Sequence, residues 1–137
     1  MRIMAFDYGT KRIGIAVTDP LQIIATALIT IHPKDVIEYL KKYLSAEQVQ
    51  TFVIGMPKQM DGSDSQSASH VKGFIRLLKK TFPQVPTVTI DERFTSKMAS
   101  ASIAASGLKR SKRQDKSLID AISAVIILQD YLKTTQH

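Results

Sequence analysis

The sequence predicts an α/β fold: a mixed five-stranded sheet, in which three antiparallel strands are followed by two parallel ones, with helices on both faces. Three observations support this prediction. Short apolar segments separated by turn residues open the chain, a wholly apolar run at 51–57 ends at Pro57, and helical spacing of apolar residues dominates later segments. At 137 residues the chain has the length of one domain, which we take to span 1–137.

The first three strands are expected near the N-terminus. Residues 2–7 and 12–18 are short apolar segments on either side of a turn at 8–11, where Gly9 adopts turn conformations that other residues resist. A third strand is expected over 25–31. Short connections of this kind join antiparallel strands, so these segments predict a meander.

The rest of the chain alternates helices with strands. In the helical segments, apolar residues recur at intervals of three and four, whereas the strands are short apolar runs. We expect, in order, a helix over 35–44, a strand over 51–57, a polar loop over 58–69, a helix over 71–82, a strand over 86–90, a helix over 97–106 and a final helix over 117–132. Ligands of such sheets usually bind at the carboxyl ends of the parallel strands.

The composition excludes several kinds of chemistry. The chain has no cysteine, which rules out disulfides, cysteine zinc sites, iron–sulfur clusters and thiol nucleophiles. Its three histidines, His32, His70 and His137, are not spaced as metal ligands. No apolar run reaches the roughly 18 residues of a membrane span, and the N-terminus lacks the apolar core of a secretion signal. We therefore expect a cytoplasmic protein without a membrane partner.

The charge predicts a polyanionic partner. Nineteen Lys and Arg against twelve Asp and Glu give a formal net charge of +7. The segment 109–116 contains five of the basic residues and one acid. A solvated loop would explain such a run, but its position just before the final helix favours phosphate contacts by Lys109, Arg110, Lys112 and Arg113.

Acidic residues stand at the ends of the predicted elements. Asp7 ends the first strand, Asp91 and Glu92 follow the last one, and Asp120 lies in the first turns of the final helix. Adjacent parallel strands would bring Asp7 and the 91–92 pair to one edge of the sheet, and the final helix would lay Asp120 across it. Clustered carboxylates repel one another unless cations lie between them. Mg²⁺ or Mn²⁺ prefers oxygen ligands, and two such ions promote phosphodiester hydrolysis.

Each acid also has a purely structural interpretation. Asp7 fits a hairpin turn, and Asp91 could accept backbone hydrogen bonds. Ser117 and Asp120 match a helix capping box. However, Asp120 shares a helical face with apolar residues at the fourth, seventh and eleventh positions beyond it (Ala124, Ile127 and Tyr131), which disfavours a solvated acid.

Four blocks of the chain, FDYGTKRIGIAVTD, VIGMPKQMDGS, DERFTS and KSLIDAISAVIILQDYL, resemble the YqgF (RuvX) family, of RNase H-like fold, in order over essentially the whole sequence. The resemblance implies a bacterial cytoplasmic nuclease, described both as a Holliday junction resolvase and as a factor that matures the 5′ end of 16S ribosomal RNA. It implies two bound Mg²⁺ or Mn²⁺ ions and catalytic acids at Asp7, Glu92 and Asp120, with Asp91 beside Glu92 as a further metal ligand.

The assignment of Glu92 depends on one departure from related resolvases. Those enzymes carry an acid at the end of the fourth strand, whereas TFVIGMP contains none. Glu92 would take over that role from the neighbouring strand. Lys11, Arg12 and Arg93 flank the proposed carboxylates and are expected to contact phosphates, although charge balance at the surface would also explain them.

Two other functions remain open at the level of the sequence. The DYGT segment resembles the first phosphate-binding turn of actin-like ATPases and sugar kinases, but those enzymes need two domains. A basic RNA-binding assembly factor, associated with the precursor of the small ribosomal subunit, would need no catalytic acids. The sequence does not choose between RNA and a four-way DNA junction, or between a monomer and a homodimer.

Overall fold

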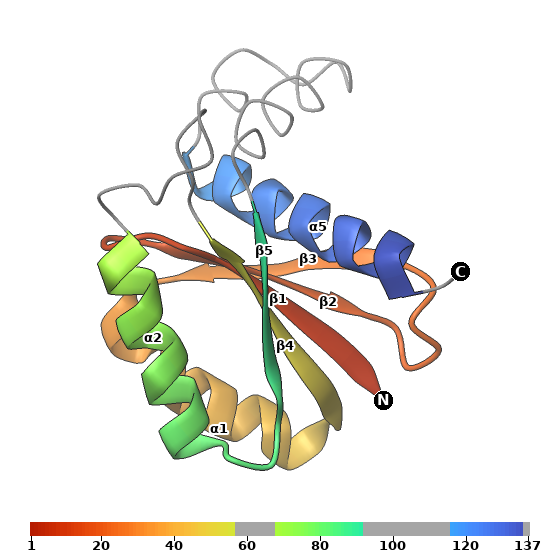
Figure 1. Cartoon of the computed structure of the whole chain (residues 1–137), viewed down its shortest axis with the longest axis horizontal. Helices are drawn as coiled ribbons and strands as arrows, with labels where there is room; N and C mark the ends of the chain where they lie inside the picture. Colours follow the sequence, from red (N-terminus) through yellow and green to blue (C-terminus); the bar gives the residue numbers. More distant parts are fainter. Residues whose placement is uncertain (57–67, 92–115, 136–137) are drawn as a thin grey trace.

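A computed structural model gives the structure of the protein and describes residues 1–56, 68–91 and 116–135 (Figure 1). In these residues the chain forms one five-stranded sheet in the order β3-β2-β1-β4-β5. The pairs β1/β2 and β2/β3 are antiparallel, whereas β1/β4 and β4/β5 are parallel. This arrangement confirms the predicted mixed sheet.

The strands lie where the apolar segments predicted them, with small shifts at their ends. β1 includes Tyr8, so Asp7 lies inside the strand rather than at its last residue, and β4 begins two residues before the predicted start. The bounds are β1 Arg2–Tyr8, β2 Ile13–Thr18, β3 Ala25–Ile31, β4 Val49–Met56 and β5 Thr87–Asp91.

The turn between β1 and β2 requires the glycine that the sequence places there. A Cβ atom on Gly9 would lie 2.7 Å from the carbonyl oxygen of Arg12. That separation is shorter than any normal contact, and the obstructing atom belongs to the backbone. Gly9 therefore permits the close approach that reverses the chain.

The helices follow the predicted apolar faces. They are the 3₁₀-helix η1 Pro33–Asp35, α1 Val36–Ala46, α2 Ala68–Thr81 and α5 Lys116–Thr135. The predicted loop over 58–69 is wrong at its end, because Ala68 and Ser69 belong to α2, and burial of Ala68 extends the helix. The predicted helix over 97–106 lies outside the described residues. None of the helices in the described ranges combines the length and the apolar character needed to cross a membrane.

The two faces of the sheet carry different cores. We call the face covered by α1 and α2 the aromatic face, since it contains the buried rings of Phe6, Phe52, Phe74 and Phe82. We call the face covered by α5 the small-residue face; its buried members are Ile3, Ala5, Ala16, Val53, Ala124, Ile127, Leu128 and Leu132. Figure 1 shows α1 and α2 on one side of the sheet and α5 on the other.

Candidate functional site

Asp7 lies on the small-residue face, near the carboxyl end of β1. Successive side chains of a strand point to opposite faces, and Ile3 and Ala5 belong to the small-residue face. Asp7 continues that alternation and is partly buried. Its partner in the antiparallel ladder is Gly14 of β2.

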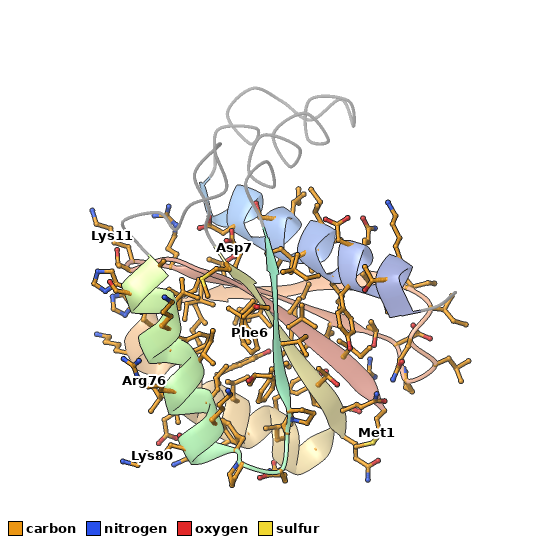
Figure 2. All side chains as sticks on the ribbon, viewed as in Figure 1. Met1, Phe6, Asp7, Lys11, Arg76 and Lys80 are labelled. Atoms are coloured by element: carbon orange, nitrogen blue, oxygen red, sulfur yellow. The ribbon has the colours of Figure 1, made fainter. Side chains whose placement is uncertain are left out.

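Gly14 allows α5 to approach the sheet so closely that Asp120 lies near Asp7. A Cβ atom on Gly14 would lie 2.1 Å from the carbonyl oxygen of Asp120 and 2.4 Å from its carbonyl carbon. The backbone of α5 therefore rests directly on β2 beside Asp7. Figure 2 shows Asp7 next to the N-terminal turns of α5. Two acids that are remote in the sequence thus share one end of one face.

The helical face of Asp120 is the one that packs on the sheet. Ala124 and Ile127 are fully buried and Tyr131 packs against the same cluster, as the spacing from Asp120 indicated. The capping-box interpretation is weakened, because α5 begins at Lys116 and Ser117 is already inside the helix. Asp120 is directed toward the sheet rather than into solvent.

A cation already contacts this site. The Nε of Arg12 donates a hydrogen bond to Oδ2 of Asp120 at 2.8 Å, and the two side chains are 37% and 22% exposed. This contact uses one of the five N–H donors of the guanidinium group. Lys11, the preceding residue in the turn, is exposed and directed away from the sheet (Figure 2).

Asp91, the last residue of β5, lies two strands away from the strand of Asp7. Asp91 pairs with Met56 of β4, and β4 lies between β1 and β5. The expectation that the strands of Asp7 and Asp91 are adjacent is therefore wrong; the parallel strand β4 separates them because it pairs with both. Two interstrand spacings amount to roughly 10 Å, so ligands from β5 would have to reach across β4.

Gly55 lies in β4, between the strands that carry Asp7 and Asp91. It lies one residue beyond the Phe6–Ile54 pair, which places it level with Asp7, and it shares the alternation of Val53 on the small-residue face. Because glycine has no side chain, β4 presents no obstruction on this face between β1 and β5. Neither Gly14 nor Gly55 was identified from the sequence, although an isolated glycine inside a strand indicates close approach of another group.

Several predicted site residues lie outside the described residues. They are Glu92, Arg93, Lys109, Arg110, Lys112 and Arg113, and for Asp91 only the backbone is described. Their proposed roles stay predictions. The structure thus brings together Asp7, Arg12 and Asp120 of the predicted set.

The described carboxylates fit a hard divalent cation in their chemistry. Asp7 and Asp120 offer only oxygen ligands, which Mg²⁺ and Mn²⁺ prefer. Over residues 1–56, 68–91 and 116–135, no three acidic or imidazole groups converge on one point. A complete ion site would therefore need a ligand beyond these two, the position for which Glu92 was predicted.

Comparisons with known proteins identify the family that this chain resembles. A family model described as "RuvX: Holliday junction resolvase" matches residues 1–134. A Flavobacterium johnsoniae protein named "Putative pre-16S rRNA nuclease" is 51% identical over 133 residues, which cover 97% of this chain and 96% of the relative. A Parabacteroides distasonis protein of the same name is 48% identical over 136 residues, with 99% and 97% covered.

A solved structure shows the same fold. The chain matches "T. thermophilus RuvC in complex with Holliday junction substrate" with a TM-score of 0.54 and 15% identity, over 98% of this chain and 96% of that one. At this identity the likeness concerns the fold alone. It confirms the RNase H-like architecture that the sequence blocks implied.

Proposed function

This chain belongs to the RuvX family, and we propose that it is a metal-dependent endonuclease that hydrolyses phosphodiester bonds in structured nucleic acid, with precursor 16S ribosomal RNA as its substrate. The single observation that carries the proposal is the packing of α5 on Gly14, which brings Asp7 and Asp120 to one end of one face. Carboxylates brought together at one end of a sheet are typical of a site that binds cations.

Asp7 and Asp120 would hold the ions together with Glu92 and Asp91, and Asp7, Glu92 and Asp120 are the proposed catalytic residues. When bound, two ions would supply an activated water and would neutralise the charge of the departing oxygen. The protein's own contribution is to fix the carboxylates: β1 holds Asp7 in the sheet, and α5 holds Asp120 against β2. This rigidity avoids reorganising the ligands during the reaction.

Basic residues around the carboxylates would position the substrate. Lys11, Arg12 and Arg93 are proposed to contact phosphates next to the scissile bond. Lys109, Arg110, Lys112 and Arg113 are proposed to follow the backbone without reading its sequence, as phosphate contacts generally do. Arg12 would then connect the two functions, since it contacts Asp120 and carries further donors.

The names of the relatives support precursor 16S rRNA as the substrate. A four-way DNA junction is the second candidate, favoured by the description of the family. Action on precursor rRNA would place the protein in the bacterial cytoplasm, in contact with the precursor of the small ribosomal subunit. Symmetrical cleavage of a junction would instead require two sites and hence a homodimer, whereas a monomer suffices for RNA.

The decisive experiment compares wild-type protein with Asp7→Asn on both substrates. With Mg²⁺ or Mn²⁺ present, we expect wild type to cut precursor 16S RNA and Asp7→Asn to be at least about 100-fold slower, which corresponds to a loss of about 2.7 kcal/mol of transition-state stabilisation. The substitution removes a charge at almost constant shape, so folding and nucleic-acid binding should persist.

Asp35→Asn is the matched control, because Asp35 is exposed on the opposite side of the sheet and its side chain makes no capping hydrogen bond to α1. This variant should cut as fast as wild type. Cleavage of the junction but not of the RNA would reassign the substrate. If Asp7→Asn cuts as well as wild type, or if wild type binds both substrates and cuts neither, the protein is a binding factor and the nuclease proposal fails.

A further inference from the structure

The exposed side of α2 carries only positive charge. Between Ala68 and Thr81 the sequence contains no Asp or Glu. We call its four exposed basic residues the α2 basic stripe: Lys72, Arg76, Lys79 and Lys80. Figure 2 shows Arg76 and Lys80 projecting from the outer side of this helix. None of these residues belongs to the site described above.

The stripe has a regular spacing and a fixed direction. Residues four apart lie on the same side of a helix, so Lys72, Arg76 and Lys80 form one row with a rise of about 6 Å per step. The opposite side of α2 is anchored, because Val71, Phe74 and Leu78 are buried in the aromatic face. The row is therefore held toward solvent.

The helix itself does not explain this row. A cation in the last turn interacts favourably with the helix dipole, which accounts for Lys79 and Lys80 but not for Lys72 in the N-terminal half. Like charges four residues apart destabilise a helix. No acid within the described ranges forms an ion pair with Arg76, Lys79 or Lys80. For Arg76, Lys79 and Lys80, no ion pair within these ranges offsets the mutual repulsion of the positive charges.

The neighbouring helix shows that the aromatic face does not require a basic surface. α1 packs on the same face, and the exposed charges of α1 together with its flanking residues are balanced. From η1 to the residue after α1, three lysines accompany three acids: Lys34, Lys41 and Lys42 with Asp35, Glu38 and Glu47. Among the helical segments of the aromatic face, residues 33–47 thus carry no net charge, whereas α2 carries an excess of positive charge.

The stripe begins at the same end of the molecule as the carboxylates. Tyr8, at the end of β1, stacks on Phe74 in the first half of α2, with ring centroids 4.9 Å apart. Lys11 lies on the turn that follows β1, and Figure 2 shows it at the end where α2 begins, with Arg76 and Lys80 successively farther along the helix. Positive charge thus continues from the end of the sheet beside Asp7 onto the outer side of α2, which covers the aromatic face.

We infer that the α2 basic stripe binds the phosphate backbone of a second segment of the nucleic-acid substrate, one that leaves the cleavage site over the β1–β2 turn and passes along α2. This inference rests on the proposed function for the identity of the polyanion. It predicts a preference for branched or folded substrates, since a short linear segment would not reach both faces of the sheet. The contacts are to phosphates and carry no sequence preference.

The test is the salt dependence of binding by the full chain, measured by fluorescence anisotropy without divalent ions so that no cleavage occurs. The probes are a folded precursor 16S RNA fragment and a four-way DNA junction. The variant Lys72→Gln/Arg76→Gln/Lys80→Gln should lower the slope of log affinity against log salt by about 2–3, which is 0.7–0.9 for each lost phosphate contact. The probe with the larger fall identifies the polyanion.

The matched control is Lys34→Gln/Lys41→Gln/Lys42→Gln, which removes the same charge from η1 and α1 and should change the slope by less than about 1. Equal falls in both variants would overturn the inference, because they would show a general charge effect. A melting temperature no lower than that of wild type shows that the stripe variant is folded; if it is lower, single Arg76→Gln should still reduce the slope by about 0.7–0.9.

The result for the α2 basic stripe can be distinguished from the result for the nuclease proposal. A stripe-dependent slope in a protein that cuts neither probe would retain the binding surface and reject the nuclease. Cleavage of a probe by wild type, together with a slope that the stripe variant leaves unchanged, would retain the nuclease and reject the binding surface.

Discussion

The two faces of the sheet differ in the size of the residues that cover them, and the difference separates stability from function. On the aromatic face, Phe6 meets Phe52 and Phe74 edge to face, with ring centroids 5.5 and 5.4 Å apart. On the small-residue face, alanines and Gly14 lie under α5. Large rings fill the space below α1 and α2, whereas small residues let α5 approach the sheet closely.

This difference shows on which face the exact position of a helix matters for the candidate site. A packed aromatic cluster contributes mainly buried apolar area, and its helices lie on the face opposite the carboxylates. The close contact of α5 with β2, by contrast, decides where Asp120 lies relative to Asp7. Substitutions on the two faces should therefore have different consequences for stability and for cleavage.

The largest effect on stability is expected from Phe6→Ala. Phe6 is fully buried and contacts two other rings, so its removal should lower the free energy of unfolding by about 3–5 kcal/mol, measured by urea denaturation. Cleavage per folded molecule should stay near that of wild type, because Phe6 points away from the carboxylates. A loss of cleavage greater than the loss of folded protein would contradict the separation of the two faces; the milder Phe6→Leu allows this comparison if the alanine variant is unfolded.

Gly14→Ala should have the opposite consequences: a smaller loss of stability than Phe6→Ala and a larger loss of cleavage. The new Cβ would meet backbone atoms of Asp120 at 2.1 and 2.4 Å, so α5 must shift. We expect a loss of about 1–3 kcal/mol in the free energy of unfolding and a further fall in cleavage of about 100-fold among folded molecules, since small displacements of catalytic groups are costly. Activity normalised to the folded fraction is the measurement.

Gly73→Ala provides the matched control on the opposite side of the sheet. Its added Cβ would lie 3.9 Å from Nη2 of the flexible Arg76 side chain, an ordinary van der Waals contact, and alanine is favoured over glycine inside a helix. The variant should be more stable by about 0.5–1 kcal/mol and should cut normally. If Gly14→Ala behaved in the same way, the contact of α5 with β2 would not position the site.

The smallest effect on stability is expected from Arg12→Gln. The ion pair of Arg12 with Asp120 is partly exposed, so its loss should change the free energy of unfolding by no more than about 1 kcal/mol. Removing a cation beside Asp120 should strengthen Mn²⁺ binding in calorimetric titrations and weaken nucleic-acid binding. Weaker Mn²⁺ binding would instead show that Arg12 orients the carboxylate for the ion.

Much of the architecture could be predicted from local patterns. The alternation and brevity of the apolar segments identified the five strands, and the three- and four-residue spacing identified α1, α2 and α5. The apolar face predicted for the helix over 71–82 comprised Val71, Phe74, Ile75, Leu78 and Phe82, and all but the partly buried Ile75 are buried, because a helical period assigns residues to a face without knowledge of the partner. The start of α2 was misplaced, since packing of Ala68 against the core is not a local property.

The candidate site could be predicted only in part. Asp7 and Asp120 were identified because acids at the end of a strand and on an apolar helical stripe conflict with their surroundings. The roles of Gly14 and Gly55 were not identified, because each depends on a group from a distant part of the chain. The position of β4 between β1 and β5 was also missed, since strand order depends on which edges pair rather than on the composition of any strand.

Within the described residues, the sequence by itself determined which segments become strands and helices and which side of the helices is apolar, because hydrophobic periodicity acts over a few residues. Only the tertiary structure decided that α5 lies against β2 at Gly14 and that Asp120 therefore meets the end of β1. The physical reason is that two elements approach this closely only where one of them has no side chain and the backbone of the other occupies the vacant space. The two parts are far apart in the sequence, so no local pattern contains both.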